Sequence, residues 1–206
     1  MITPDVTELA SLVRGKAGNA SRFMVAIAGA PASGKSTLAE NLRNVLARAG
    51  ETAIVVPMDG FHYDDVILNA RGHRPRKGAP FTFDAPGFAS LLKRIKAGEK
   101  DIAIPVFDRT MELARAGADI VDDKAKFILI EGNYLLLNQP PWANLRALFD
   151  YAIYLKVPAE ELERRLIQRW LDLGFDMNYA TNWIASNDIL NIREVINNSS
   201  PADLTI

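Results

Sequence analysis

The sequence predicts an α/β protein in three layers, with a mainly parallel, twisted sheet between two layers of helices. Short apolar runs typical of buried strands alternate with longer segments in which apolar residues recur at helical spacing. Strands that are apolar throughout are typical of a parallel sheet covered on both faces. No linker or shift in composition divides the chain, so we expect one domain over residues 1–206.

The predicted elements follow in order along the chain. Apolar, partly β-branched runs predict the main strands at 24–28, 52–56, 126–130 and 151–157, with two short strands at 101–106 and 118–121. Apolar stripes, with the residues that begin or end them, predict helices at 34–49, 84–97 and 159–173, and further helix up to about 197. Residues 60–85 are polar, basic and rich in glycine and proline, so we expect a long insertion there, on the acceptor side of the site proposed below.

Composition narrows the class of protein. The chain has 49% hydrophobic and 24% charged residues, which is typical of folded proteins. A formal net charge of −1 disfavours a protein that coats nucleic acid. The absence of cysteine excludes disulfides, thiolate metal sites and a cysteine nucleophile. Since no apolar stretch is long enough for a signal core or a membrane span, we expect a cytoplasmic protein.

A phosphate-binding loop is the most specific motif. Residues 29–36 match G-x-x-x-x-G-K-[ST], between a predicted buried strand and an amphipathic helix. The backbone N–H groups of such a loop surround phosphate oxygens. We expect Lys35 to reach the β- and γ-phosphates of ATP and the Ser36 hydroxyl to bind Mg²⁺. The predicted nucleotide-binding residues are Gly29, Ala30, Pro31, Ala32, Ser33, Gly34, Lys35, Ser36 and Thr37.

Two carboxylates follow predicted strands at the edge of the sheet where the phosphate loop lies. Glu131 comes after an unbroken apolar run and is predicted to hold Mg²⁺, directly or through water. The alternative is an acid that merely ends a strand. Asp59 follows the second strand, where it could accept a hydroxyl proton as the γ-phosphoryl group leaves ATP. An Asp-Gly pair such as Asp59-Gly60 is also typical of an ordinary turn.

The order of these motifs resembles the phosphoribulokinase, uridine kinase and pantothenate kinase family of P-loop kinases. After the phosphate loop, these kinases carry D-[SG]-F, which here is Asp-Gly-Phe at 59–61. Segments resembling their P-x-[FY]-D, E-G and arginine-bearing lid helix follow in the same order, at 105–108, 131–132 and 165–174. The resemblance covers about residues 22–175 and implies the P-loop NTPase fold with a helical lid.

The resemblance also implies catalytic roles. Asp59 would be the catalytic base. Lys35, Arg165 and Arg169 would stabilise the phosphoryl group in transfer, with both arginines on a lid at about 159–180. Arginine suits this task because its planar donors match phosphate oxygens. Without the resemblance, the same arginines, close to several glutamates, are equally typical of a solvated helix face.

The acceptor side is defined less sharply. By resemblance, Asp108 and Arg109 would hold the hydroxyls of the acceptor. His62 lies three residues after the predicted base and could contact the same molecule. Arg76 and Lys77 end the densest basic run of the chain, which we interpret as a loop that attracts an anionic acceptor. A nucleic-acid patch and a simply solvated loop are the alternatives.

Three departures separate the chain from typical uridine kinases. Leu173 stands where an arginine precedes the lid glycine, Trp170 replaces the acid after the second lid arginine, and Arg109 follows Asp108 directly. The combination looks most like a bacterial subgroup of nucleoside/nucleotide kinase-like or fructose-transport-associated kinases. We therefore expect an ATP- and Mg²⁺-dependent kinase that phosphorylates a hydroxyl of a sugar, nucleoside or pantothenate-like metabolite, with a link to fructose uptake.

Other functions stay open as alternatives. The first is a nucleotide-binding regulator of the same fold without turnover. A GTPase is disfavoured because the chain has no N-K-x-D string. The expected partner is a small molecule rather than nucleic acid or membrane, and relatives that form dimers and tetramers point to a homodimer.

Overall fold

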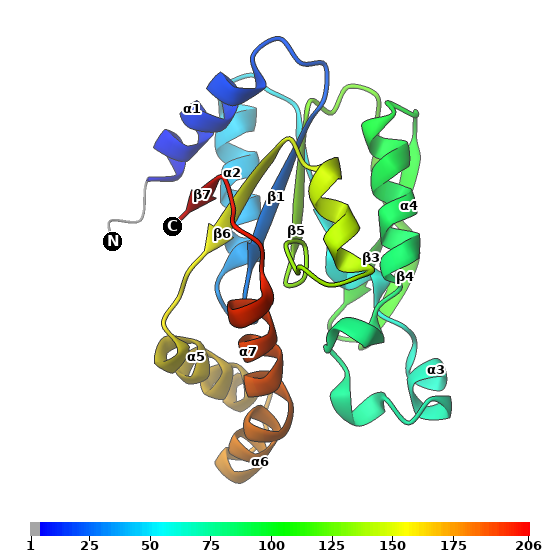
Figure 1. The fold of residues 1–206 in the computed structure, drawn as a ribbon, viewed down its shortest axis with the longest axis vertical. Coiled ribbons are helices and arrows are strands. Elements are labelled where there is room, and N and C mark those ends of the chain that lie inside the picture. The colour runs from blue at the N-terminus through cyan, green and yellow to red at the C-terminus, as the bar shows by residue number, and fades with distance from the viewer. Residues whose placement is uncertain (1–4) are drawn as a thin grey trace.

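The computed structural model describes residues 5–206, and it confirms a mainly parallel sheet flanked by helices (Figure 1). Five strands pair in the order β2-β5-β1-β6-β7, and every paired register among them is parallel. β1 and β5 are buried along their whole length, as central strands with both faces covered must be. The strands are β1 (Phe23–Gly29), β2 (Ala53–Pro57), β5 (Phe127–Gly132), β6 (Tyr151–Leu155) and β7 (Leu204–Thr205).

Alternate residues of β1 serve two separate cores, one on each face of the sheet. Val25 and Ile27 pack in the core that includes α1 (Val6–Ala17) and α2 (Lys35–Arg48). Ala26 lies in the other core, to which three further helices contribute. These helices are α4 (Ala85–Lys96), α5 (Ala159–Asp172) and α7 (Ile189–Asn198).

The two short strands predicted between the insertion and β5 lie outside the main sheet. β3 (Ile102–Asp108) and β4 (Leu113–Val121) pair antiparallel as a hairpin, and both are longer than expected. Residues 115–120 of β4 are all exposed, so this part of the strand has no buried face. The tip of the hairpin, residues 109–112, lies beside the site described below.

α1 and β7 are among the elements missing from the sequence-based prediction. α1 follows the N-cap Asp5, and its buried residues Leu9, Val13 and Ala17 recur every four positions, a pattern that could have predicted the helix. β7 has only two residues, which is too short for any period to appear.

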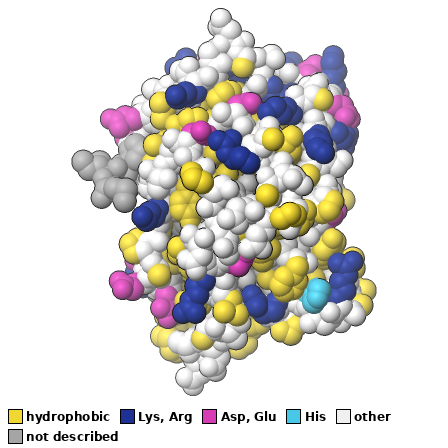
Figure 2. Space-filling view, in the orientation of Figure 1, with side chains coloured by type: hydrophobic (Ala, Val, Ile, Leu, Met, Phe, Trp, Pro, Cys, Tyr) yellow, Lys and Arg dark blue, Asp and Glu magenta, His cyan; other side chains and the backbone are white. Residues whose placement is uncertain are grey.

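Charge is mixed over the face of the molecule shown in Figure 2, where Lys and Arg side chains stand among Asp and Glu side chains. This distribution agrees with the formal net charge of −1. Among the described residues, none of the helices combines the length and the apolar character needed to cross a membrane.

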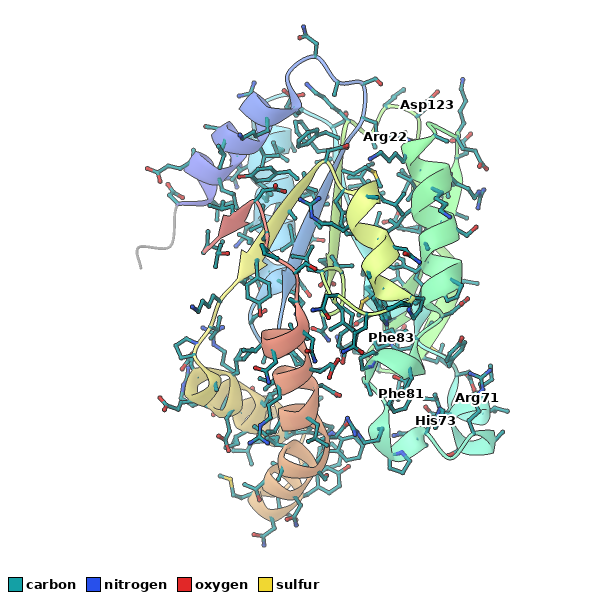
Figure 3. The ribbon with its side chains drawn as sticks, viewed as in Figure 1. Arg22, Arg71, His73, Phe81, Phe83 and Asp123 are labelled. Carbon is teal, nitrogen blue, oxygen red and sulfur yellow. The ribbon has the colours of Figure 1, made fainter. Side chains whose placement is uncertain are left out.

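The insertion predicted at 60–85 contains α3 (Asp65–Ala70) and several 3₁₀ turns. It is anchored at its base, where Phe83 is buried among Tyr134 and Trp142. Figure 3 shows Phe83 at this base, whereas Phe81 lies toward the outer end of the insertion, and the Phe81 side chain is 49% exposed. Only some of its aromatic residues therefore hold the insertion to the core.

Candidate active site

A cavity of about 550 Å³ opens at the carboxyl end of the parallel strands. Ligands bind at this edge in open α/β sheets, because the loops after neighbouring strands converge there. The phosphate loop, the ends of β2 and β5, the hairpin tip and the lid all contribute to its walls. The predicted site residues that line it are Pro31, Ala32, Gly34, Lys35, Ser36, Thr37, Asp59, His62, Lys77, Arg109, Glu131 and Arg169.

The phosphate loop joins β1 to α2 and has the backbone needed to hold an anion. Gly34, the N-cap of α2, has a φ of 96°, a left-handed conformation that favours glycine. A side chain at Gly29 would come within 2.9 Å of the Leu155 carbonyl oxygen, so this turn also needs glycine. The Ser33 hydroxyl is buried and has no hydrogen-bond partner within residues 5–206, as expected for a group that awaits a ligand.

Lys35 and Glu131 form the charged floor of the cavity. The Lys35 ammonium donates to the Ala30 carbonyl oxygen at 3.0 Å, and burial lowers its pKa although two carboxylates oppose this shift. Burial and the negative charge of Asp59 raise the pKa of Glu131 to about 7, against the Lys35 charge and a hydrogen bond from Ser36. The hydroxyl and carboxylate that meet here are oxygen ligands of the kind Mg²⁺ prefers, so the residues present fit this ion.

Asp59 lies at the end of β2, at the start of the 3₁₀ turn Met58–Phe61. Gly60 must follow it, because a Cβ atom there would lie 2.3 Å from the Pro105 carbonyl oxygen. Burial alone would raise the pKa of the Asp59 carboxyl, but positive charges, including those of Arg109 and Lys35, hold it below its ordinary value. Arg109 donates to Asp59 Oδ2 at 2.6 Å.

His62 is packed between two aromatic rings close to Asp59. Its ring centroid lies 3.9 Å from that of Phe83 and 4.9 Å from that of Phe107. Burial lowers the pKa of His62, which favours the neutral ring. His62 Nδ1 lies 2.9 Å from the carbonyl oxygen of Asp59, so the ring supports the turn that carries the predicted base.

The remaining residues predicted for the acceptor contact the protein itself. Arg76 donates to the amide oxygens of Asn187 and Asn191, at 3.0 and 3.1 Å. Lys77 donates to Asp65 at 2.8 Å and to the Glu112 carbonyl oxygen at 2.9 Å. Among the described residues, Arg76 is absent from the cavity lining and Lys77 belongs to it. These contacts tie the insertion to the C-terminal helices and to the hairpin tip.

Asp108 belongs to the turn of the hairpin. Its carboxylate accepts from the backbone N–H groups of Thr110 and Met111, and it pairs with Arg115 at 3.3 Å. Within residues 5–206, Asp108 is absent from the cavity lining, so the structure separates it from Arg109, its neighbour in the predicted acceptor set.

Of the two predicted arginines on the lid helix α5, Arg165 contacts the phosphate loop and Arg169 faces the cavity. Arg165 donates to the carbonyl oxygens of Ala32 and Ser33, each at 3.3 Å. Arg169 lines the cavity, and burial together with the nearby charge of Arg109 lowers its pKa. Glu161 pairs both with Arg165, at 2.7 Å, and with Arg164, the third arginine of this helix, at 2.8 Å. Arg165 therefore contacts the phosphate loop while keeping an ion pair typical of a helix face, and Arg169 faces the cavity.

Comparisons with known proteins agree with this geometry. The model of the family described as "Phosphoribulokinase / Uridine kinase family" matches residues 24–186. The chain belongs to this family. It is therefore a P-loop kinase, an ATP-dependent phosphotransferase that acts on a hydroxyl group, as the sequence predicts.

Several relatives resemble this kinase over most of its length. "Putative uridine kinase C227.14" of Schizosaccharomyces pombe is 34% identical over 203 residues, covering 90% of this chain and 83% of the relative. A pantothenate kinase of Corynebacterium diphtheriae is 31% identical over 73% of this chain, which spans about half (49%) of that relative. A "putative fructose transport system kinase" from Silicibacter sp. TM1040, a crystal structure, is 43% identical, covers 99% of this chain and 100% of its own, and has a TM-score of 0.94.

The kinase has an aromatic wall that is absent from the site residues predicted from the sequence. It consists of Trp170, Phe175, Tyr179 and Trp183, all of which line the cavity. The rings of Phe175 and Tyr179 stack 4.4 Å apart, and that of Trp183 lies parallel to Tyr179 at 6.3 Å. Trp170 packs edgewise against this row. Phe175, Tyr179 and Trp183 follow one another at a spacing of four residues, on and beside α6 (Met177–Trp183), and this pattern could have revealed the wall.

Asp188 is another cavity residue that is absent from the predicted site residues. It accepts a hydrogen bond from the indole N–H of Trp170 at 3.3 Å, and burial raises its pKa. It ends the π-helical turn Ile184–Asp188 between α6 and α7, and such turns often occur at functional sites. A carboxylate beside an aromatic wall offers both a hydrogen-bond acceptor and an apolar face.

Proposed function

We propose that this kinase transfers the γ-phosphoryl group of ATP to a hydroxyl whose proton passes to Asp59. The observation that carries the proposal is that Asp59, Lys35 and Glu131, from three separate segments, line one cavity together with the phosphate loop. Catalysis of this kind depends on positioning and on stabilising charge, and these residues supply both.

The transfer exchanges one phosphorus–oxygen bond for another. The acceptor oxygen bonds to the γ-phosphorus, and the bond from that phosphorus to the β–γ bridging oxygen breaks, so ADP leaves. The hydroxyl proton passes to a carboxylate oxygen of Asp59. Lys35, Arg165 and Arg169 hold the phosphate oxygens, whose negative charge is shared between the two molecules during transfer.

Mg²⁺ fits the site formed by Ser36 and Glu131. When bound, the ion neutralises phosphate charge. Glu131 must be ionised to hold it, so the raised pKa of this carboxyl makes metal binding favour a pH above about 7.

The acceptor lies on the side of the cavity bounded by the hairpin, the insertion and the aromatic wall. Phe83, Phe107 and the wall supply flat apolar surface, while Asp188 and Arg109 supply polar contacts. These features suit a sugar, a nucleoside or a pantothenate-like molecule, each of which combines hydroxyl groups with an apolar face or chain. Uridine kinase and pantothenate kinase are the names of relatives, and a link to fructose uptake rests on the name of the Silicibacter protein.

ADP release tests this function. The purified protein, with ATP and Mg²⁺, is incubated with fructose and other sugars, with nucleosides and with pantothenate. We expect one acceptor class to stimulate ADP release in the wild type and not in Lys35→Ala, which also loses ATP binding because its ammonium no longer holds phosphate. Tight ATP binding without ADP release across the whole panel would instead support a nucleotide-binding regulator.

A further inference from the structure

The tip of the β3–β4 hairpin covers the predicted catalytic base. Arg109, at this tip, donates to Asp59 Oδ2 at 2.6 Å, so its guanidinium occupies one oxygen of the carboxylate that the acceptor hydroxyl must reach. The two side chains differ in exposure, with Arg109 56% exposed and Asp59 23% exposed. The arginine is therefore the outer partner, and a molecule entering the cavity can displace it.

The hairpin tip is held in place from both sides. The Arg109 guanidinium lies over the Phe107 ring, 5.5 Å from its centroid. Beyond Arg109, the Lys77 ammonium donates to the Glu112 carbonyl oxygen at 2.9 Å. The Asp108 carboxylate closes the turn between them by accepting from two backbone N–H groups. Contacts on both flanks make the Arg109–Asp59 pair a built feature of the unliganded protein.

The Arg109–Asp59 salt bridge hinders access to Asp59 more for water than for an alcohol acceptor. A cavity that admits an acceptor also admits water, which can attack the γ-phosphorus of bound ATP and waste it. Water needs the same proton acceptor, Asp59, but it offers few contacts with which to displace the charged guanidinium. A larger acceptor can contact both the cavity walls and the freed guanidinium, so it can replace the contact that Arg109 loses.

We propose that Arg109 guards Asp59, keeping transfer to water slow until an alcohol acceptor displaces the guanidinium. This inference rests on the proposed kinase function. In the suppressed reaction, the water oxygen bonds to the γ-phosphorus, the bond to the β–γ bridging oxygen breaks, and a water proton passes to Asp59. The products are ADP and inorganic phosphate. Arg109 thereby sets specificity between an alcohol and water rather than between alcohols.

The test is ADP release from ATP and Mg²⁺ with no acceptor present. We expect Arg109→Ala to raise this basal rate roughly tenfold, because the base becomes free. Arg109→Lys keeps a cation at this position, so its basal rate of ADP release should stay close to that of the wild type. The double variant Asp59→Asn/Arg109→Ala should lose the increase, since it has no base. Arg115→Ala is the matched control, because Arg115 lies on the same hairpin with similar exposure (54%) and pairs with Asp108 instead.

Two results would overturn the proposal that Arg109 slows transfer to water by covering Asp59. The first is a basal rate in Arg109→Ala equal to that of the wild type while transfer to an acceptor still occurs. The second is an increase that persists in the double variant, since Asp59 would then be irrelevant to it. Failure of the kinase function gives a different pattern, in which the wild type releases no ADP with fructose, uridine or pantothenate.

Discussion

The two sides of the cavity are built in different ways. The phosphate side is formed by a continuous loop and by groups that await a ligand, such as the unpartnered Ser33 hydroxyl. On the acceptor side, Lys77 and Arg109 line the cavity but are already bonded to other parts of the protein. The phosphate side is thus preformed, whereas binding on the acceptor side must exchange one set of contacts for another. The phosphate side binds the phosphates of ATP, which are the same in every reaction, whereas the acceptor side binds the molecule that differs between kinases.

Removing the Glu131 carboxylate should affect the phosphate side most. We expect Glu131→Gln to lower the rate of transfer about 100-fold, because a neutral amide holds Mg²⁺ poorly. The acceptor KM should change little. The measurement is steady-state kinetics at several Mg²⁺ concentrations, and a rate independent of Glu131 would remove it from the metal site.

The same variant should be more stable than the wild type without ligands. Because the folded-state pKa of Glu131 is raised to about 7, the folded protein keeps a proton that the unfolded chain loses above its ordinary pKa. This costs the wild type stability as pH rises from about 4.5 toward 7. Glu131→Gln should therefore gain roughly 1–3 kcal/mol at pH 8 and much less at pH 5. Urea unfolding at both pH values tests this, with the exposed Glu40→Gln as control.

Truncating the aromatic wall should affect the acceptor side alone. Tyr179→Ala removes the middle ring of the stacked row, and we expect the acceptor KM to rise about tenfold with ATP affinity unchanged. Met177→Ala, on the same helix and also exposed, should have little effect. An equal rise in the KM for ATP would place the nucleotide, rather than the acceptor, against the wall.

The smallest expected effect concerns the join between the insertion and the C-terminal helices. Arg76→Ala leaves the buried Asn191 amide oxygen without its donor and removes one of two donors to the Asn187 amide oxygen, at a cost of about 1–3 kcal/mol. Exposed Arg164→Ala should cost much less. The measurement is the free energy of unfolding in urea. If Arg76 served only to hold an anionic acceptor, its loss would raise the acceptor KM without lowering stability.

The difference between the phosphate side and the acceptor side also explains how much of the site could be predicted from the sequence. The phosphate loop, Asp59-Gly60-Phe61 and Glu131 each lie at the carboxyl end of an apolar strand, so a local pattern predicts both their chemistry and their place at the sheet edge. The acceptor side depends on contacts between distant segments. Asp59 and Arg109 are separated by 50 residues along the chain, and Arg76 and Asn187 by 111.

Side-chain type predicted charge correctly on the acceptor side but could not reveal which partner each charge has. Asp108 and Arg109 are adjacent in sequence, yet one closes a turn and the other covers the base. Trp170 and Trp183 lie on separate helices and meet only after the lid folds back on itself. Only folding shows that these rings face the cavity.

The most direct test of Asp59 as the base compares Asp59→Asn with the wild type. Asparagine keeps the shape of the side chain but cannot take the hydroxyl proton. With the acceptor found in the panel, we expect transfer to fall about 1,000-fold while ATP affinity, measured by calorimetry, stays within about twofold. Transfer at the wild-type rate with ATP bound normally would contradict the assignment of Asp59 as the catalytic base.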